Sequence, residues 1–150
     1  MASLRPTKVV IHTLGFVGSA DIDGDGDAVD DVDEWHKSNG WNGIGYHVLF
    51  RQNGEIEYGR SETTKGAHCK DMGMNSKALG AAFEGHGDHE PWTVHQTQQF
   101  LNWFKGVNER WGIEGDDILG HREAGAPKTC PGTLIDCDKV RSLATRFLTL

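Results

Sequence analysis

The sequence lacks any long apolar run. None of its 150 residues belong to a stretch that approaches the roughly 18 consecutive apolar residues of a membrane-spanning helix, so no membrane span is expected. The first residues also lack the order of a secretory signal, in which positive charge is followed by an apolar segment and small residues. A hydrophobic content of 37% beside 25% charged residues is typical of globular proteins. We therefore expect a globular chain without a signal peptide.

Positive charge and cysteine are also scarce. The formal net charge is -7, and without a basic stripe to neutralise phosphates we expect no nucleic-acid partner. The three cysteines are an odd number, which argues against a disulfide framework. Cys69 and Cys137 are interpreted as buried thiols and Cys130 as a metal ligand. The spacing also allows a Cys130–Cys137 disulfide, which would consume that ligand.

A Gly- and Pro-rich segment near the C-terminal end indicates a metal site. Residues 120–132 read GHREAGAPKTCPG and place His121 and Cys130 nine residues apart, in a segment that cannot form one regular helix or strand. Imidazole and thiolate together suit zinc, and a catalytic zinc needs three protein ligands with one position left for water. The best third candidate is His12, near the end of an apolar run that predicts a buried strand over residues 8–13. Spacing alone is weak support, because a lone histidine on a strand is more often structural.

Three motifs, in the same order, resemble the type-2 N-acetylmuramoyl-L-alanine amidases. The motifs are Val10-Ile11-His12-Thr13, Gly43-Ile44-Gly45-Tyr46-His47, and Gly120-His121 followed by Lys128-Thr129-Cys130-Pro131-Gly132. The enzymes of this family use zinc to cut peptidoglycan and share their fold with the animal peptidoglycan recognition proteins. In length and motif detail the chain is most similar to the short, single-domain phage endolysins.

The resemblance implies a function and a setting for the whole chain. Residues 1–150 would form one catalytic domain, holding one catalytic Zn²⁺ through His12, His121 and Cys130. The partner would be bacterial peptidoglycan, and the protein would act as a monomer. An endolysin would stay in the host cytoplasm until a membrane lesion releases it to the cell wall.

The resemblance also implies roles for other residues. Tyr46 takes the place of a tyrosine that assists catalysis beside the zinc, although sequence alone favours a half-buried aromatic at a strand start. Lys128 would stabilise negative charge on the substrate carbonyl oxygen. His68 and Asn75 fall where the family often places substrate-contacting groups, and Glu123 either supports His121 or lies at the surface.

Two other functions remain open. A non-catalytic peptidoglycan-binding module could use the same fold, but such relatives commonly lack the cysteine ligand that Cys130 provides. A structural protein could use the histidines and the cysteine to hold a metal that stabilises its fold. Such a structural zinc site has four protein ligands, and the sequence shows no obvious fourth.

An acidic stretch precedes the first predicted helix. Residues 21–27 read DIDGDGD and begin like a calcium loop, in which carboxylates at alternate positions converge on the ion. The match fails at the twelfth position, where Val32 stands in place of a glutamate. Candidate ligands for a structural Ca²⁺ are Asp21, Asp23, Asp25, Asp27 and Asp31. The alternative is a solvated loop whose aspartates cap the next helix.

The remaining pattern predicts an α/β fold, with a mixed central β-sheet flanked by about three helices. Strands are expected over 8–13, 46–52, 55–58, 79–84 and 117–120, with a hairpin at Asn53-Gly54. Helices are expected over 27–39, from a capping box at Thr93 and Gln96 to residue 111, and over 137–148. We also expect a loose arm over 1–7 and an exposed loop over 85–90.

Two finer expectations concern which side chains face inward. Alternation along the strand 46–52 predicts that Tyr46, Val48 and Phe50 share one face. In the long helix, the residues expected on the core-facing stripe are Val94, Thr97, Leu101, Phe104, Val107 and Trp111.

Overall fold

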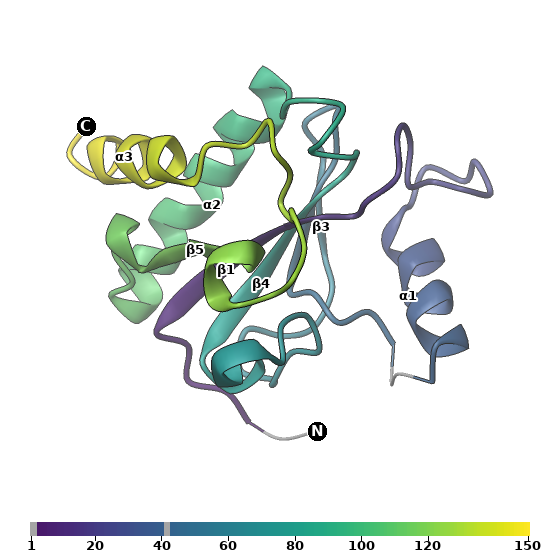
Figure 1. Cartoon of the computed structure of the whole chain (residues 1–150), viewed down its shortest axis with the longest axis horizontal. Helices are drawn as coiled ribbons and strands as arrows, with labels where there is room; N and C mark the ends of the chain where they lie inside the picture. Colours follow the sequence, from purple (N-terminus) through teal and green to yellow (C-terminus); the bar gives the residue numbers. More distant parts are fainter. Residues whose placement is uncertain (1–2, 41–42) are drawn as a thin grey trace.

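The computed structural model describes residues 3–40 and 43–150. Five strands form one sheet in the order β3-β2-β4-β1-β5 (Figure 1). The strands are β1 (Lys8–Thr13), β2 (Val48–Phe50), β3 (Ile56–Tyr58), β4 (Ala78–Phe83) and β5 (Ile118–Gly120). Every pairing is parallel except that of β3 with β2 at the sheet edge. The predicted mixed sheet and the hairpin at Asn53-Gly54 are confirmed.

Three α-helices flank this sheet in the described ranges. They are α1 (Val29–Ser38), α2 (Val94–Trp111) and α3 (Cys137–Phe147), with short 3-10 helices η1 (Asp71–Ser76), η2 (Gly115–Asp117) and η3 (His121–Ala124). Figure 1 shows α2 and α3 together and α1 apart from them on the other side of the molecule. This arrangement confirms the predicted α/β class.

The sheet residues alternate between two cores. Val9 and Ile11 of β1 join the main core, which is formed with the inner faces of α2 and α3. Val10 and His12 point to the opposite face, where α1, η1 and η3 provide the cover. His12 is therefore a buried polar side chain, 1% exposed, that directly follows the apolar run Val9-Val10-Ile11.

Helix α2 begins at the predicted capping box and ends at a glycine. The Thr93 hydroxyl accepts from the Gln96 N–H, and the Gln96 side chain accepts from the Thr93 N–H. The predicted core stripe is wrong at Val94, which is 79% exposed. Gln96 takes the inward position, because its amide donates to the Phe50 and Glu84 carbonyls at 3.0 and 2.9 Å. A stripe that begins on a polar residue is not visible from hydrophobicity.

Two other local expectations are also wrong. The segment 3–7 is no loose arm: the Leu4 N–H donates to the Thr63 carbonyl at 2.7 Å, and the Leu4 side chain is buried in the main core. Residues 1–2 lie outside the described ranges. Tyr46 does not share a face with Val48 and Phe50, because the strand begins only at Val48. Tyr46 instead packs with Leu49 on the α1 side.

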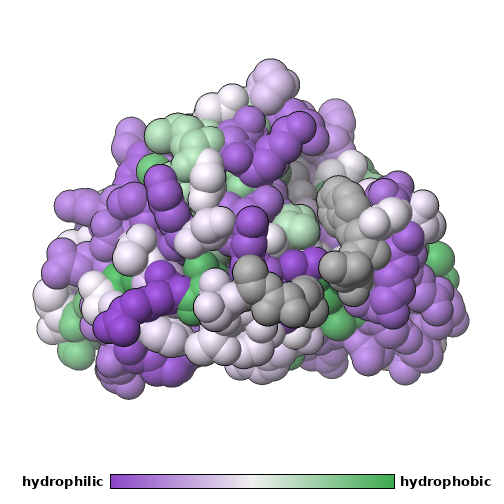
Figure 2. All heavy atoms as spheres, turned by 90° about the horizontal axis from the view of Figure 1, so that it is seen from below, coloured by the Kyte–Doolittle hydropathy of each residue, from purple (hydrophilic) through white to green (hydrophobic). Residues whose placement is uncertain are grey.

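The surface offers no sign of a membrane-spanning element in the described ranges. None of their helices is long and apolar enough to cross a bilayer. On the face shown in Figure 2, hydrophilic side chains predominate and hydrophobic ones form small separate groups.

Candidate metal centre and substrate groove

The parallel pairing of β1 with β5 places two histidines side by side. Ile11 pairs with Gly120, so the next residues along the chain, His12 in β1 and His121 at the start of η3, lie at the same edge of the sheet. Their ring centroids are 4.5 Å apart. Ligand sites in open α/β sheets lie beyond the carboxyl ends of the strands, and this edge is such a place.

The loop after η3 returns Cys130 to the two histidines. The Arg122 N–H donates to the Cys130 carbonyl at 2.8 Å, and the Thr13 N–H donates to the Cys130 Sγ at 3.4 Å. The Cys130 Sγ then lies 3.9 Å from the His12 Nδ1. The three expected ligands therefore meet, with one donor atom from each lying within 4.8 Å of the others.

The expected exposed loop over 85–90 supports this arrangement. Gly87 is buried, and its carbonyl accepts from the Leu134 N–H at 2.9 Å. A Cβ on Gly87 would lie 1.8 Å from the Pro131 carbonyl oxygen, so only glycine allows this approach. Asp88 accepts from the Thr129 hydroxyl at 2.8 Å. The loop is thus a packed support for the Cys130 segment, and the expectation of an exposed turn is wrong.

The donor set fits a zinc ion. A nitrogen and a sulfur that bind one zinc are separated by at most the sum of the two bond lengths, roughly 4.4 Å, and the His12–Cys130 distance satisfies this limit. Burial lowers the pKa of both His12 and His121, which favours the neutral imidazoles that metal binding requires. Burial raises the pKa of the Cys130 thiol to about 11, so a cation must displace its proton. No fourth His, Cys, Asp or Glu of the described residues joins this group.

A groove runs past the three donors. One cavity of about 530 Å³ is lined by His12, Tyr46, Lys128 and Cys130, and a second of about 520 Å³ adjoins it at His121. The Tyr46 ring lies 5.2 Å from that of His12. Burial, followed by the nearby Cys130, raises the pKa of the Tyr46 hydroxyl, which therefore remains a hydrogen-bond donor. Lys128 is exposed and lines both cavities.

Other sequence candidates serve the scaffold. The Asn75 side-chain oxygen accepts from the His68 and Cys69 N–H groups at 2.8 and 2.7 Å, so this oxygen is occupied by backbone. Both His68 and Asn75 line the second cavity, and their contact with substrate stays a prediction. Glu123 accepts from the Gly120 N–H and pairs with Arg141 at 2.7 Å, tying η3 to α3.

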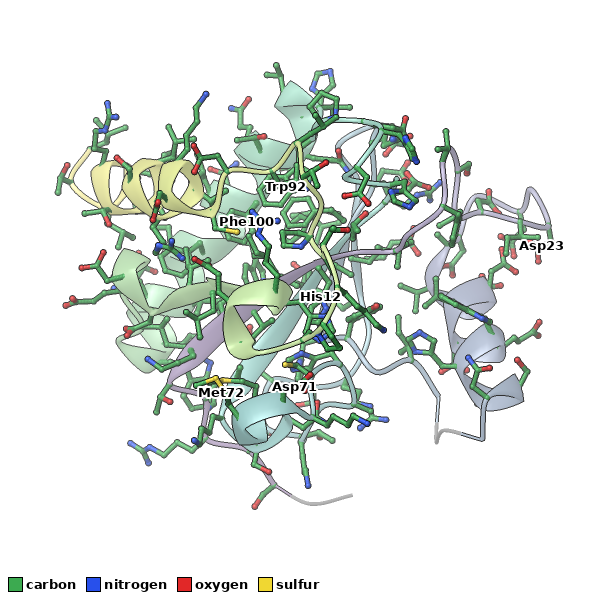
Figure 3. The ribbon with its side chains drawn as sticks, viewed as in Figure 1. His12, Asp23, Asp71, Met72, Trp92 and Phe100 are labelled. Atoms are coloured by element: carbon green, nitrogen blue, oxygen red, sulfur yellow. The ribbon has the colours of Figure 1, made fainter. Side chains whose placement is uncertain are left out.

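Two contacts to the proposed ligands were not identified from the sequence. His68 is buried, and its Nδ1 lies 3.0 Å from the His12 Nε2. Asp71, close to His12 in Figure 3, approaches the His121 Nε2 at 3.7 Å. All three cysteines are free thiols, so no Cys130–Cys137 disulfide competes for the ligand.

The acidic loop lies far from this centre, as the position of Asp23 in Figure 3 shows. The structure brings together Asp21, Asp23, Asp25 and Asp31 but not Asp27, whose carboxylate accepts from the Val29 N–H at 3.1 Å. Calcium binding stays a prediction. A melting temperature unchanged by calcium, measured after chelation, would favour the capping alternative.

Comparison with known proteins agrees with the geometry. Residues 2–133 match the N-acetylmuramoyl-L-alanine amidase family. The endolysin of Enterobacteria phage K11 is 32% identical over 130 residues, which cover 83% of this chain and 80% of the endolysin. Peptidoglycan-recognition protein SC1a of Drosophila melanogaster is 33% identical over 108 residues, or 69% of this chain and 56% of that protein.

A solved structure extends the likeness to three dimensions. The N-acetylmuramoyl-L-alanine amidase LysC from Clostridium intestinale URNW matches with a TM-score of 0.81 and 27% identity, over 93% of this chain and 85% of LysC. With the family match covering most of its length, this chain belongs to the N-acetylmuramoyl-L-alanine amidase family.

Proposed function

We propose that the protein is a zinc-dependent N-acetylmuramoyl-L-alanine amidase. It hydrolyses the amide between N-acetylmuramic acid and L-alanine in bacterial peptidoglycan, as an endolysin that causes cell lysis. The observation that carries the proposal is the convergence of His12, His121 and Cys130 in a groove that also holds Tyr46 and Lys128. Residues 1–150 act as one catalytic domain and as a monomer, released from the host cytoplasm through a membrane lesion.

The chemistry follows from the positions of these side chains. When bound, zinc would lower the pKa of a coordinated water toward about 7 and polarise the substrate carbonyl. As water attacks the amide, negative charge grows on the carbonyl oxygen, and the ammonium of Lys128 stabilises it from the groove wall. The Tyr46 hydroxyl donates to the same oxygen or orients the attacking water. The two adjoining cavities give a polymeric substrate room on both sides of His121.

A peptidoglycan-binding module without catalysis is the second candidate. It is favoured by the likeness to peptidoglycan-recognition protein SC1a. The presence of Cys130 together with both histidines supports the enzyme, since a binding module has no need of a metal-ligating cysteine in its groove.

End-group analysis separates the two candidates. Purified peptidoglycan treated with the protein is expected to gain new L-alanine amino termini and no new reducing sugars. Sedimentation with the wall and no release of amino termini would support the binding module.

Replacing Lys128 by methionine tests the role of its charge. We expect kcat/KM on a muramyl peptide to fall ~10²–10³-fold, because one group that stabilises developing charge contributes about 2.7–4 kcal/mol. Bound zinc, measured in the same samples, is expected to stay unchanged. Lys70→Met is the matched control, because Lys70 is an exposed lysine lining the same groove. Equal losses in both variants would show that Lys128 acts only through the general charge of the groove.

A further inference from the structure

We propose that His68 is a positioning residue that selects the ring nitrogen by which His12 binds its metal. The inference rests on the proposed zinc site. Its basis is a relay that begins at a backbone carbonyl in β4 and ends at the face of His12 turned toward Cys130. Each link of the relay is a short contact between described residues.

The first link fixes the proton on His68. The His68 Nε2 lies 3.1 Å from the Ala78 carbonyl oxygen, and because a carbonyl can only accept, this nitrogen must carry the proton. His68 is 8% exposed, and the ring partners that it has among the described residues, His12 and the Ala78 carbonyl, include no carboxylate, so nothing there would offset the charge of a buried imidazolium. A neutral imidazole with its proton on Nε2 has a lone pair on Nδ1. His68 therefore offers an acceptor to His12.

The second link is the contact by which the tautomer of His68 determines the tautomer of His12. The His68 Nδ1 lies 3.0 Å from the His12 Nε2, so His12 must donate from Nε2. The remaining nitrogen of His12, Nδ1, then carries the lone pair, and it is the atom 3.9 Å from the Cys130 Sγ. The opposite tautomer of His12 would place a proton where the metal must bind. A hydrogen bond to the far nitrogen is the usual means of orienting a metal-ligating histidine.

Two glycines leave the space that the His68 ring needs in order to make these two contacts. A Cβ on Gly80 would lie 2.5 Å from the His68 Cγ, and one on Gly66 would lie 2.4 Å from the His68 Cδ2. Neither glycine has a positive φ, so space rather than backbone conformation requires them. The Asn75 side chain fixes the other end of the residue by accepting from the His68 N–H at 2.8 Å. The ring is thus held on two sides by backbone and at its base by a side chain.

Three variants test the relay through zinc affinity. His68→Phe keeps a ring but removes both hydrogen bonds, and we expect zinc affinity to fall ~10–100-fold, as for other partners of metal-binding histidines. His68→Gln can both accept and donate, so we expect it to recover part of the loss. Gly80→Ala leaves all polar groups in place but displaces the ring, and it should weaken zinc binding in the same direction. Affinities are measured on the full chain by competition with a chromophoric chelator.

A general loss of stability must be distinguished from loss of positioning. Phe104→Leu, in the main core on the opposite face of the sheet, is the control: it should lower the free energy of unfolding and leave the zinc affinity of the folded protein unchanged. Unfolding of all variants is followed in the metal-free state.

The tautomers can be read without zinc. Nitrogen-15 NMR of the metal-free wild type should show the proton on Nε2 in both His68 and His12. A proton on Nδ1 of His12, or unchanged zinc affinity in His68→Phe, would overturn the positioning role while leaving the zinc site intact. Failure of the wild type to bind zinc would instead overturn the proposed function, and the positioning role with it.

Discussion

Replacing Cys130 by serine is expected to remove the bound zinc and to lower amidase activity by more than ~10³-fold, beyond the loss from any single charge-stabilising group. A serine hydroxyl is a poor zinc ligand, and two imidazoles alone leave the ion with too few protein ligands. The substitution removes no packing partner of the main core, because Cys130 lies on the groove. We therefore expect the variant to fold, with loss of zinc and activity together.

The other two cysteines provide matched controls. Cys137→Ser changes a buried thiol at the start of α3, and Cys69→Ser changes a thiol that lies beside Asp71 and His121 in a second group of donor atoms. Both variants are expected to keep about one zinc per chain and most of the activity. Retention of zinc by Cys130→Ser, with loss in Cys69→Ser, would place the metal in the second group and contradict the proposed site.

Replacing Arg51 by methionine is expected to lower the free energy of unfolding by ~3–5 kcal/mol, the cost of leaving a buried charge without its partner. Arg51 is 7% exposed, and its guanidinium donates to Glu84 at 3.0 Å and to Glu57 at 2.8 Å. Glu84 is only 4% exposed, so its carboxylate cannot be solvated in place of the lost pair. Urea unfolding of the wild type and the variant measures the difference.

The loss of unfolding free energy is expected to be large because the Arg51 ion pairs are also connected to helix α1. Glu57 also accepts from the Ala28 and Val29 N–H groups at the start of α1, so loss of Arg51 loosens the partner that caps this helix. A second substitution, Glu84→Gln, removes the unpaired charge and should restore part of the stability of Arg51→Met. A loss below about 1 kcal/mol in the single variant would mean that the pair behaves as a surface salt bridge.

Local sequence signals predicted much of the fold. β1 has the expected bounds, and the Thr93–Gln96 capping box places the start of α2. The Asn53-Gly54 turn marks the β2–β3 hairpin. These features depend on residues close together in the chain, where turn chemistry and capping leave a readable pattern.

Contacts between distant segments were not readable in the same way. The cap of α1 comes from Glu57 in β3, not only from the aspartates that precede the helix. Gln96 faces inward because its side-chain amide donates to the backbone carbonyls of Phe50 and Glu84, which lie outside α2. His68 supports His12 across 56 residues of sequence. None of these partners has a local spacing rule.

In the candidate site, too, the residues within sequence motifs could be predicted and their distant contacts could not. His12, His121, Cys130, Tyr46 and Lys128 are recognisable because they stand in motifs resembling those of the amidases, and the structure places all five at one groove. The pairing of β1 with β5 explains why the motif that contains His12 meets the motif that contains His121, although the two lie near opposite ends of the chain. The supports around them, from the Gly87 loop and from His68, became visible only in three dimensions.

The most direct test of the account is a zinc titration of the metal-free chain, followed by release of L-alanine-terminated peptide from a muramyl peptide. We expect activity to rise in proportion to added zinc and to stop rising at about one equivalent per chain. Full activity in the rigorously metal-free protein, or tight uptake of zinc without any cleavage, would contradict a zinc amidase built on His12, His121 and Cys130.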